Sequence, residues 1–373
     1  EQGMRLDACV STTPVCSPYR AVLMTGLFGH HTGVTTNRHY PDLSVHPCVG
    51  TTLRDAGYKC GYIGKWHLGD LQVDAGDPLR LGFDDEWFVG GDSHNYYAWS
   101  YVTGSGDPVV EEENGFYRTI VEPVRAIDYI KRQDGDSPWC LFMSWGPPHP
   151  PLLAPDPYVA PYLETELTKH PNTSKMAGDW MTDGVNDWYA HYYGMTEGID
   201  IEWGRLMAAL EKSGQAENTI VIYSSDHGEM LASQGLRGKR WPHRESTQVP
   251  FVVRWPGKVE AGSSLAMPFG TPDIFPTICG LAGVAVPDGL DGGDFSGAFL
   301  GQSDALTQEY AYTAMHHAFV VWPGWRGIRT KRYNYASTED GPWVLFDLEN
   351  DPYEQNNLVG EEPELVAKLN GML

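Results

Sequence analysis

Residues 219–230 read TIVIYSSDHGEM, a run of apolar and β-branched residues that stops at a polar turn containing glycine. The same change occurs at 59–69, KCGYIGKWHLG, and at 139–151, WCLFMSWGPPHPP. Short apolar runs bounded by turn residues are typical of buried strands. These three segments, and a fourth at 249–255, VPFVVRW, therefore predict strands of one sheet.

Helical patterns lie between the predicted strands. Within 117–133 the apolar residues recur at steps of three and four, the spacing of one helix face. Residues 203–212 repeat this spacing, and KSGQAEN at 212–218 ends the helix. Strands that alternate with helices indicate the α/β class, with a mostly parallel central sheet flanked by helices.

The pattern changes near residues 299–309, FLGQSDALTQE. Beyond this segment, short aromatic and β-branched runs such as YAYTAMHHAFVVW and PWVLFDLEND are separated by turn residues. Such runs favour a small antiparallel sheet. We therefore predict an α/β domain over 1–304 and a small C-terminal α+β subdomain over 305–373.

Composition argues against two classes of protein. The chain has 373 residues and a formal net charge of −23, whereas nonspecific nucleic-acid binding needs a basic surface. No apolar run approaches the ~20 residues of a membrane-spanning helix. We therefore expect neither a nucleic-acid partner nor a membrane span. The six cysteines match neither a zinc-site spacing nor a dense disulfide scaffold.

Titratable side chains follow three of the predicted strands. Lys65 and His67 follow the first, His149 the second, and Asp226 with His227 the third. A lone histidine at a strand end is more often structural, and Asp-His-Gly is also common in turns. However, ligands of α/β sheets gather beyond the carboxyl ends of the strands. Three such groups at one edge therefore predict a site, in which the Asp-His pair suits a divalent cation.

Two further segments carry charge. Lys239 lies in GKRWPHRES, which is either part of this site or a solvated run of cations. Cys16 lies in TPVCSPYRAVLMTG, where Pro18 suits the first turn of a helix. A thiol at a helix N-terminus, one turn before Arg20, has a lowered pKa. The residues alone leave two interpretations of Cys16 open. It is either a reactive cysteine, as in a Cys-His hydrolase, or an inert cysteine packed in the core.

The segment CSPYR, followed by AVLMTGLFGHHTGV, resembles the Cys-x-Pro-x-Arg signature of the type I sulfatases of the alkaline phosphatase superfamily. Tyr19 stands where this family often has Ser or Ala. Six more segments resemble family segments in family order, over nearly the whole chain. They are GYIGKWHLG, GPPHPP, SDHGE, GKRWPHRESTQVPFVVRWPG and the late RGIRTKRYNY with GPWVLFDLENDPYEQNNL.

The resemblance implies that a maturation enzyme, reading positions 16, 18 and 20, oxidises Cys16 to formylglycine (3-oxoalanine). The hydrated aldehyde then supplies an oxygen nucleophile for sulfur, which is covalent catalysis. The resemblance also implies that Asp226, His227 and residue 16 ligate a divalent cation, usually Ca²⁺. The cation would act as a Lewis acid on the sulfate.

Further roles carry over by position. The resemblance assigns Arg20 to holding the diol and balancing its charge. Lys65 and Lys239 would bind sulfate oxygens and offset charge in the transition state. His67 would act as a base on the diol, and His149 would protonate the leaving alcohol or contact the sulfate.

The expected substrate is the sulfate ester of an aryl compound, another small molecule or a glycan. The family commonly acts outside the cytoplasm, so a periplasmic or secreted protein is expected. Two other functions stay open. One is a phosphonate monoester or phosphodiester hydrolase of the same superfamily, and the other is an inactive protein that keeps an anion pocket.

One part of the family pattern is missing. The family's first strand ends in paired aspartates that complete the metal site, yet fifteen residues precede Cys16 and Asp7 lies in a different context. Two protein ligands and formylglycine are few for a hard cation that takes six or more oxygens. We therefore expect the first strand to be absent from this sequence, and residues 1–373 alone to be unstable or inactive.

Overall fold

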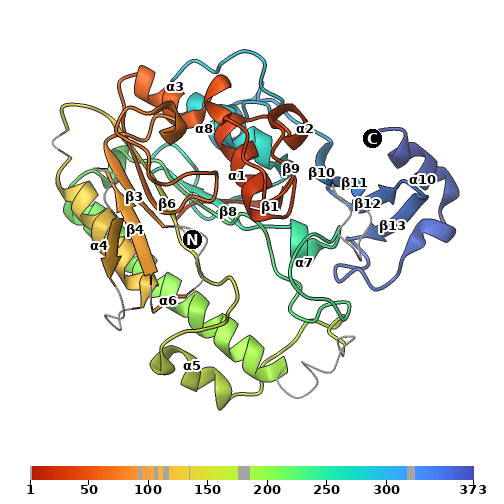
Figure 1. Ribbon diagram of the computed structural model, residues 1–373. Helices are drawn as coiled ribbons and strands as arrows, with labels where there is room; N and C mark the ends of the chain where they lie inside the picture. Colours follow the sequence, from red (N-terminus) through yellow and green to blue (C-terminus); the bar gives the residue numbers. More distant parts are fainter. Residues whose placement is uncertain are drawn as a thin grey trace. The chain divides into compact units, whose positions relative to one another are not determined.

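A computed structural model describes residues 2–90, 95–97, 99–104, 108–111, 117–133, 135–174, 185–316 and 324–373. The chain forms two compact units (Figure 1). The first unit comprises Glu1–Leu43, His170–Ala177 and Asn218–Leu373, and the second comprises Ser44–Lys169 and Gly178–Glu217.

The first unit contains a four-stranded mixed sheet. Its strands, in spatial order, are β7 (Val221–Ser224), β8 (Phe251–Arg254), β1 (Met4–Val10) and β9 (Ser264–Gly270). β8 runs antiparallel to both of its neighbours, and β1 pairs in parallel with β9. β1 and β7 therefore point the same way, and the segments that follow them leave from the same edge of the sheet.

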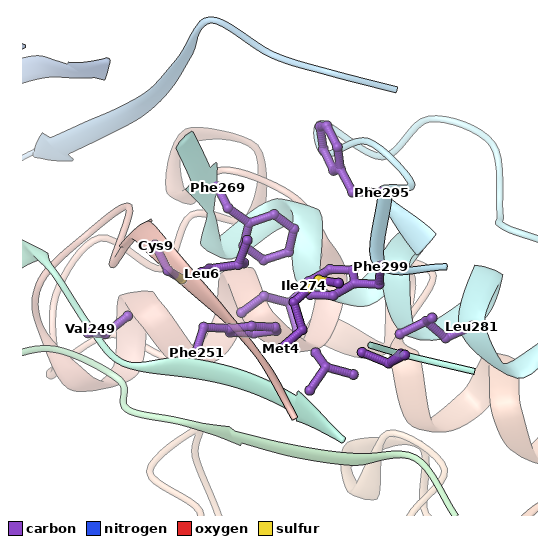
Figure 2. Packing of buried hydrophobic residues seen from close by; sticks show 12 residues of the cluster. Met4, Leu6, Cys9, Val249, Phe251, Phe269, Ile274, Leu281, Phe295 and Phe299 are labelled. Carbon is purple, nitrogen blue, oxygen red and sulfur yellow. The ribbon is translucent and has the colours of Figure 1, made fainter. Parts of the chain in front are cut away.

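Helices α1 (Cys16–Thr25), α2 (Gly29–Thr32), α8 (Ile274–Ala282) and α9 (Ser296–Phe299) belong to the same unit, as does the short α7 (Arg244–Thr247). Phe251 of β8 and Phe269 of β9 lie 5.1 Å apart between ring centroids, and Phe299 of α9 packs against both (Figure 2). The core that they form comprises Met4, Leu6, Cys9, Val249, Phe251, Val253, Val259, Phe269, Ile274, Leu281, Phe295 and Phe299.

The C-terminal part of the first unit is an antiparallel sheet, as the sequence predicts. Its strands follow one another as neighbours: β10 (Tyr310–Met315), β11 (Trp325–Thr330), β12 (Tyr333–Thr338) and β13 (Gly341–Asp347). Helix α10 (Pro363–Asn370) packs on it through Val366 and Leu369, which contact the buried Tyr335 and Leu345.

The second unit holds a five-stranded sheet in the order β5 (Pro108–Glu111), β4 (Trp99–Thr103), β3 (Glu86–Gly90), β2 (Lys59–Lys65) and β6 (Trp139–Ser144). β2 pairs in parallel with β3 and β6, whereas β4 and β5 are antiparallel. The helices of this unit are α3 (Val49–Asp55), α4 (Arg118–Lys131), α5 (Asp156–Leu163) and α6 (Val185–Lys212).

The predicted α/β class and the C-terminal antiparallel sheet are confirmed. Three details differ from the sequence prediction. The four strands predicted for one mostly parallel sheet lie in two described sheets, β7 with β8 and β2 with β6, and both sheets mix parallel and antiparallel pairs. Residues 1–15, read as a connecting segment, contain the strand β1 inside a sheet. α6 is one continuous helix that contains the predicted segment 203–212 and begins within the aromatic-rich stretch 181–193, which the sequence also favours as helical; residues 181–184 lie outside the described residues. The domain division at 304/305 stays a prediction. Among the described residues, no helix is long and apolar enough to cross a membrane.

Strands β7 and β6 are each the edge strand of their own sheet. Their sequences, VIYS and WCLFMS, are largely apolar, and every one of their residues is half-buried. An edge strand presents unpaired N–H and C=O groups that another strand can bind.

Candidate active site

Cys16 is the first residue of helix α1, as the sequence predicts. Val15 precedes it with an extended backbone and supplies no side-chain cap. The Ser17 N–H donates instead to Asn37 Oδ1 at 3.0 Å. The free N–H groups of a helix start favour anions. The Cys16 side chain is 1% exposed, so its surroundings are set by the protein.

The loop after β7 brings an imidazole to this thiol. His227 Nε2 lies 3.4 Å from Cys16 Sγ. His227 Nδ1 lies 2.8 Å from the Gly228 carbonyl oxygen, which can accept but not donate a hydrogen bond. Nδ1 therefore carries the proton of the neutral ring, and Nε2 faces Cys16 as a lone-pair donor.

Asp226 joins the same group. Its Oδ2 accepts a hydrogen bond from Arg20 Nη2 at 3.2 Å, and its Oδ1 lies 3.6 Å from His227 Nε2. The Arg20 side chain is 8% exposed and that of Asp226 is 20% exposed, so water screens this pair less than a surface pair. Cys16 and Arg20, one turn apart on α1, thus contact the two polar residues that follow β7.

Local sequence explains why the loop turns here. Ser11 Oγ donates to the Asp226 carbonyl at 2.7 Å, and Ser225 Oγ donates to the His227 carbonyl at 2.9 Å. Gly228 passes so close to Glu245 that a Cβ atom would overlap its carbonyl oxygen. Glycine is therefore required for the chain to leave the Asp-His pair in this direction.

The donor atoms of Cys16, Asp226 and His227 all lie within 4.8 Å of one another. A carboxylate, an imidazole and a residue that can present sulfur or oxygen suit a borderline divalent cation. Ca²⁺ takes 6–8 oxygen ligands. The group therefore fits part of a cation site, and among the described residues no other set of three or more such side chains lies this close.

Lys239 lies in the first unit and is half-buried, so the reading of its segment as a fully solvated run is wrong. Its neighbour Arg240 has a φ of +84°, in the left-handed region that residues other than glycine rarely adopt. The pKa of Arg240 is lowered, mainly by burial. Interaction with Cys16 raises this pKa, and repulsion from Arg38 lowers it.

Lys65, His67 and His149 lie in the second unit. Lys65 ends β2 and is 3% exposed, and His67 follows with a φ of +56°. His149 follows the parallel neighbour β6 and places its Nδ1 2.6 Å from the Pro150 carbonyl oxygen. Tyr96 holds the same residue by donating to its carbonyl at 2.6 Å. These three side chains therefore belong to the carboxyl edge of one sheet.

Of the predicted residues, Cys16, Arg20, Asp226 and His227 contact one another directly. The sequence missed two others in the first unit. Arg240 was concealed within a run of cations that resembles exposed surface. Asn37, which accepts a hydrogen bond from the Ser17 N–H, carries no recognisable signal in the sequence.

Comparison with known proteins identifies the family. The sulfatase family model matches residues 1–284, and the model for the C-terminal part of N-sulphoglucosamine sulphohydrolase matches residues 232–372. An ulvan-active sulfatase of Formosa agariphila is 34% identical over 100% of this chain and 74% of its own length. An endo-4-O-sulfatase of Bacteroides thetaiotaomicron is 28% identical over 99% of this chain and 81% of its own length.

A solved structure from work on glycosaminoglycan metabolism by Bacteroides thetaiotaomicron has the same fold. Its TM-score is 0.87 at 26% identity, and the match covers 99% of this chain and 85% of that one. Together with the cysteine, arginine, aspartate and histidine gathered at the start of α1, these matches define a sulfuric ester hydrolase. The chain belongs to the sulfatase family.

Proposed function

We propose that this protein hydrolyses a sulfate ester through formylglycine made from Cys16, with a divalent cation, Ca²⁺ in the first instance, as cofactor. One observation carries the proposal: the thiol of the Cys-x-Pro-x-Arg segment contacts the Asp-His pair after β7. A maturation enzyme that reads positions 16, 18 and 20 is the implied partner. Once in place, the hydrated aldehyde supplies the oxygen nucleophile and the cation supplies Lewis acidity.

The residues of the first unit hold these groups. Asp226 and His227 present an oxygen and a nitrogen toward residue 16, and both would be ligands of the cation. Arg20 orients the Asp226 carboxylate through its ion pair and places positive charge beside residue 16. Lys239 binds a sulfate oxygen and offsets the negative charge that grows in the transition state.

The residues of the second unit complete the proposed assignment. Lys65, buried at the end of β2, binds a second sulfate oxygen. His67 takes a proton from residue 16 as the intermediate collapses. His149 protonates the leaving alcohol through Nε2, because its Nδ1 is held by the Pro150 carbonyl. Each of these roles is tested by replacing the side chain and separating the effects on kcat and KM.

The ligand set of the cation needs further oxygens. A hard cation prefers six or more oxygens, and the described residues offer one carboxylate and one imidazole beside residue 16. Further oxygen ligands, from carboxylates or from water, would complete the coordination of the cation.

A sulfated glycan is the substrate class that we propose. The names of the relatives support it, since one acts on ulvan and another is an endo-4-O-sulfatase. Action on such polymers also supports a periplasmic or secreted location. The position of the sulfate on the sugar is left to experiment.

Turnover of two matched substrates tests the reaction class. The protein produced with a maturation enzyme is assayed on an aryl sulfate and on an aryl phosphonate monoester, with Cys16→Ala as the control. Faster, Cys16-dependent hydrolysis of the sulfate is expected. Preference for the phosphonate would favour the phosphonate hydrolase, and hydrolysis of neither would favour an anion-binding protein.

A further inference from the structure

The segment 238–247, which carries Lys239, is held by the C-terminal sheet and the turn that follows it. Three buried side chains bind backbone groups of alternate residues in this segment. The hydrogen bonds run from Trp325 Nε1 to the Arg240 carbonyl at 2.9 Å, from Asn334 Nδ2 to the Pro242 carbonyl at 2.8 Å, and from the Arg244 N–H to Glu354 Oε2 at 2.9 Å.

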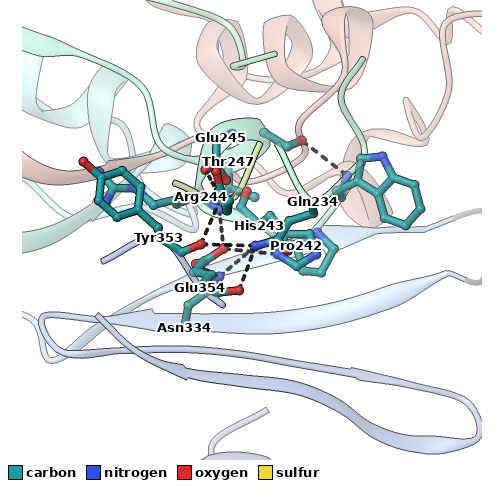
Figure 3. Close-up of polar contacts among 12 residues, drawn as sticks. Gln234, Pro242, His243, Arg244, Glu245, Thr247, Asn334, Tyr353 and Glu354 are labelled. Carbon is teal, nitrogen blue, oxygen red and sulfur yellow. Dashed lines mark hydrogen bonds and ion pairs between the residues drawn. The ribbon is translucent and has the colours of Figure 1, made fainter. Parts of the chain in front are cut away.

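Glu354 is the centre of this arrangement (Figure 3). It is 1% exposed. Its Oε2 also lies 3.2 Å from His243 Nδ1, and its Oε1 accepts a hydrogen bond from Asn334 Nδ2 at 2.7 Å. Both carboxylate oxygens therefore face donors, one from the segment 238–247 and one from β12.

The turn that presents Glu354 is itself fixed. Glu354 has a φ of +54°, a conformation that costs free energy unless the surroundings impose it. Gln234 Nε2 donates to the Glu354 carbonyl at 2.7 Å and to the Tyr353 carbonyl at 3.1 Å. Arg244 Nη1 donates to the Pro352 carbonyl. The turn therefore accepts hydrogen bonds from Gln234 and from Arg244 of the segment 238–247.

The carboxylate also balances buried positive charge. Arg329 of β11 is 8% exposed, and burial lowers its pKa to about 10 although attraction to Glu354 raises it. Arg244 repels Arg329. Removing the charge of Glu354 would leave the buried Arg329 without the counter-charge that attracts it, which is costly.

Lys239 lies between anchored neighbours. The Gly238 N–H donates to Glu229 Oε1, and the Gly238 carbonyl accepts from the Met230 N–H at 2.8 Å. Arg240, on the other side, is held in its left-handed conformation by the Trp325 bond. The direction of the Lys239 side chain therefore depends on both anchors.

We propose that Glu354 is a positioning residue for Lys239: its buried carboxylate fixes the segment 238–247, and so the direction in which Lys239 is presented. The proposal rests on the proposed role of Lys239 as a ligand of sulfate. It goes further, because it states that the orientation of the Lys239 side chain depends on the carboxylate of Glu354, 115 residues later in the chain.

Glu354→Gln is the first test. The two side chains have the same shape, but a glutamine must turn its NH₂ toward either the Arg244 N–H or Asn334 Nδ2, which are both donors. Hydrogen–deuterium exchange should then increase in 238–247 and stay unchanged in β1. The control is Glu349→Gln, the same change at a side chain that is 69% exposed. Unchanged exchange in 238–247 would overturn the proposal.

Kinetics on an aryl sulfate give the second readout. Loss of a hydrogen bond to a charged group predicts a fall in kcat/KM of about tenfold or more for Glu354→Gln. In a Lys239→Ala background the same change should have almost no further effect, because the two act through one interaction. Equal losses in both backgrounds would show a general structural role and contradict the proposal.

The design separates this proposal from the proposed function. If the protein without substitutions, produced with a maturation enzyme, hydrolyses no sulfate ester, the proposed function fails, whereas the exchange measurement still tests whether Glu354 orders the segment. If Glu354→Gln does not fold, Asn334→Ala removes the donor shared by Glu354 Oε1 and the Pro242 carbonyl. It should raise exchange in the same segment, and a folded Asn334→Ala with unchanged exchange would contradict the proposal.

Discussion

His227 Nε2 lies 3.4 Å from Cys16 Sγ, and the backbone carbonyl that binds His227 Nδ1 fixes which ring nitrogen faces the thiol. The two residues are 211 positions apart. They meet because β1 and β7 run in the same direction, so that α1 and the loop after β7 leave from one edge of the sheet.

Arg20→Lys is expected to lower kcat/KM on an aryl sulfate by about tenfold to a hundredfold, the effect of losing a well-oriented charge-assisted hydrogen bond. Lysine keeps the charge but cannot reproduce the direction of the guanidinium N–H that binds Asp226 Oδ2. Steady-state kinetics measure the change. Arg5→Lys, at an exposed Arg–Asp pair, serves as the control and should leave the rate unchanged.

Gly228→Ala should destabilise the protein and weaken cation binding, because its Cβ would overlap the Glu245 carbonyl oxygen and displace the Asp-His pair. A destabilisation of about 1–3 kcal/mol is expected for such overpacking. Urea unfolding and a cation titration measure the two effects. The matched control is Gly204→Ala in α6, where nothing lies within 4 Å and alanine should stabilise the helix slightly. Equal stability of both variants would contradict the account.

The C-terminal sheet should lose stability in acid. Hydrogen bonding to Arg332 lowers the pKa of Asp347 to about 2, below the value of about 3.9 for an unfolded aspartate. Because the folded pKa is the lower one, this contribution is complete above about pH 5 and is lost as the pH falls toward 2. The unfolding free energy of Asp347→Asn should therefore vary less with pH across this range. An identical pH profile for both proteins would count against the ion pair.

Local patterns were sufficient for much of the fold and for part of the site. The strand at 59–63, the helix at 117–133 and the helix start at Cys16 are visible because each depends on neighbouring residues. β1 was missed although Met4, Leu6 and Ala8 alternate toward the core, because seven residues near a chain end give a weak signal. Its pairing with β8 and β9 involves residues about 250 positions away.

The electrostatic partners in the site were harder to predict. Arg240 lies in a run of cations that looks solvated, yet it is half-buried, and Trp325, far along the chain, donates a hydrogen bond to its carbonyl. Glu354 lies in a segment whose resemblance to the family gave it no role, and its buried contacts come from the fold. A sequence identifies the groups that carry chemistry more readily than the groups that hold them in place.

The mass of the peptide that contains residue 16 is the measurement that tests the central claim most directly. It is made on active protein produced together with a maturation enzyme. The account predicts that the thiol has been replaced by an aldehyde, which a hydrazide reagent labels, and that sulfatase activity follows the converted fraction. Full activity in protein whose residue 16 is an unmodified cysteine would contradict it.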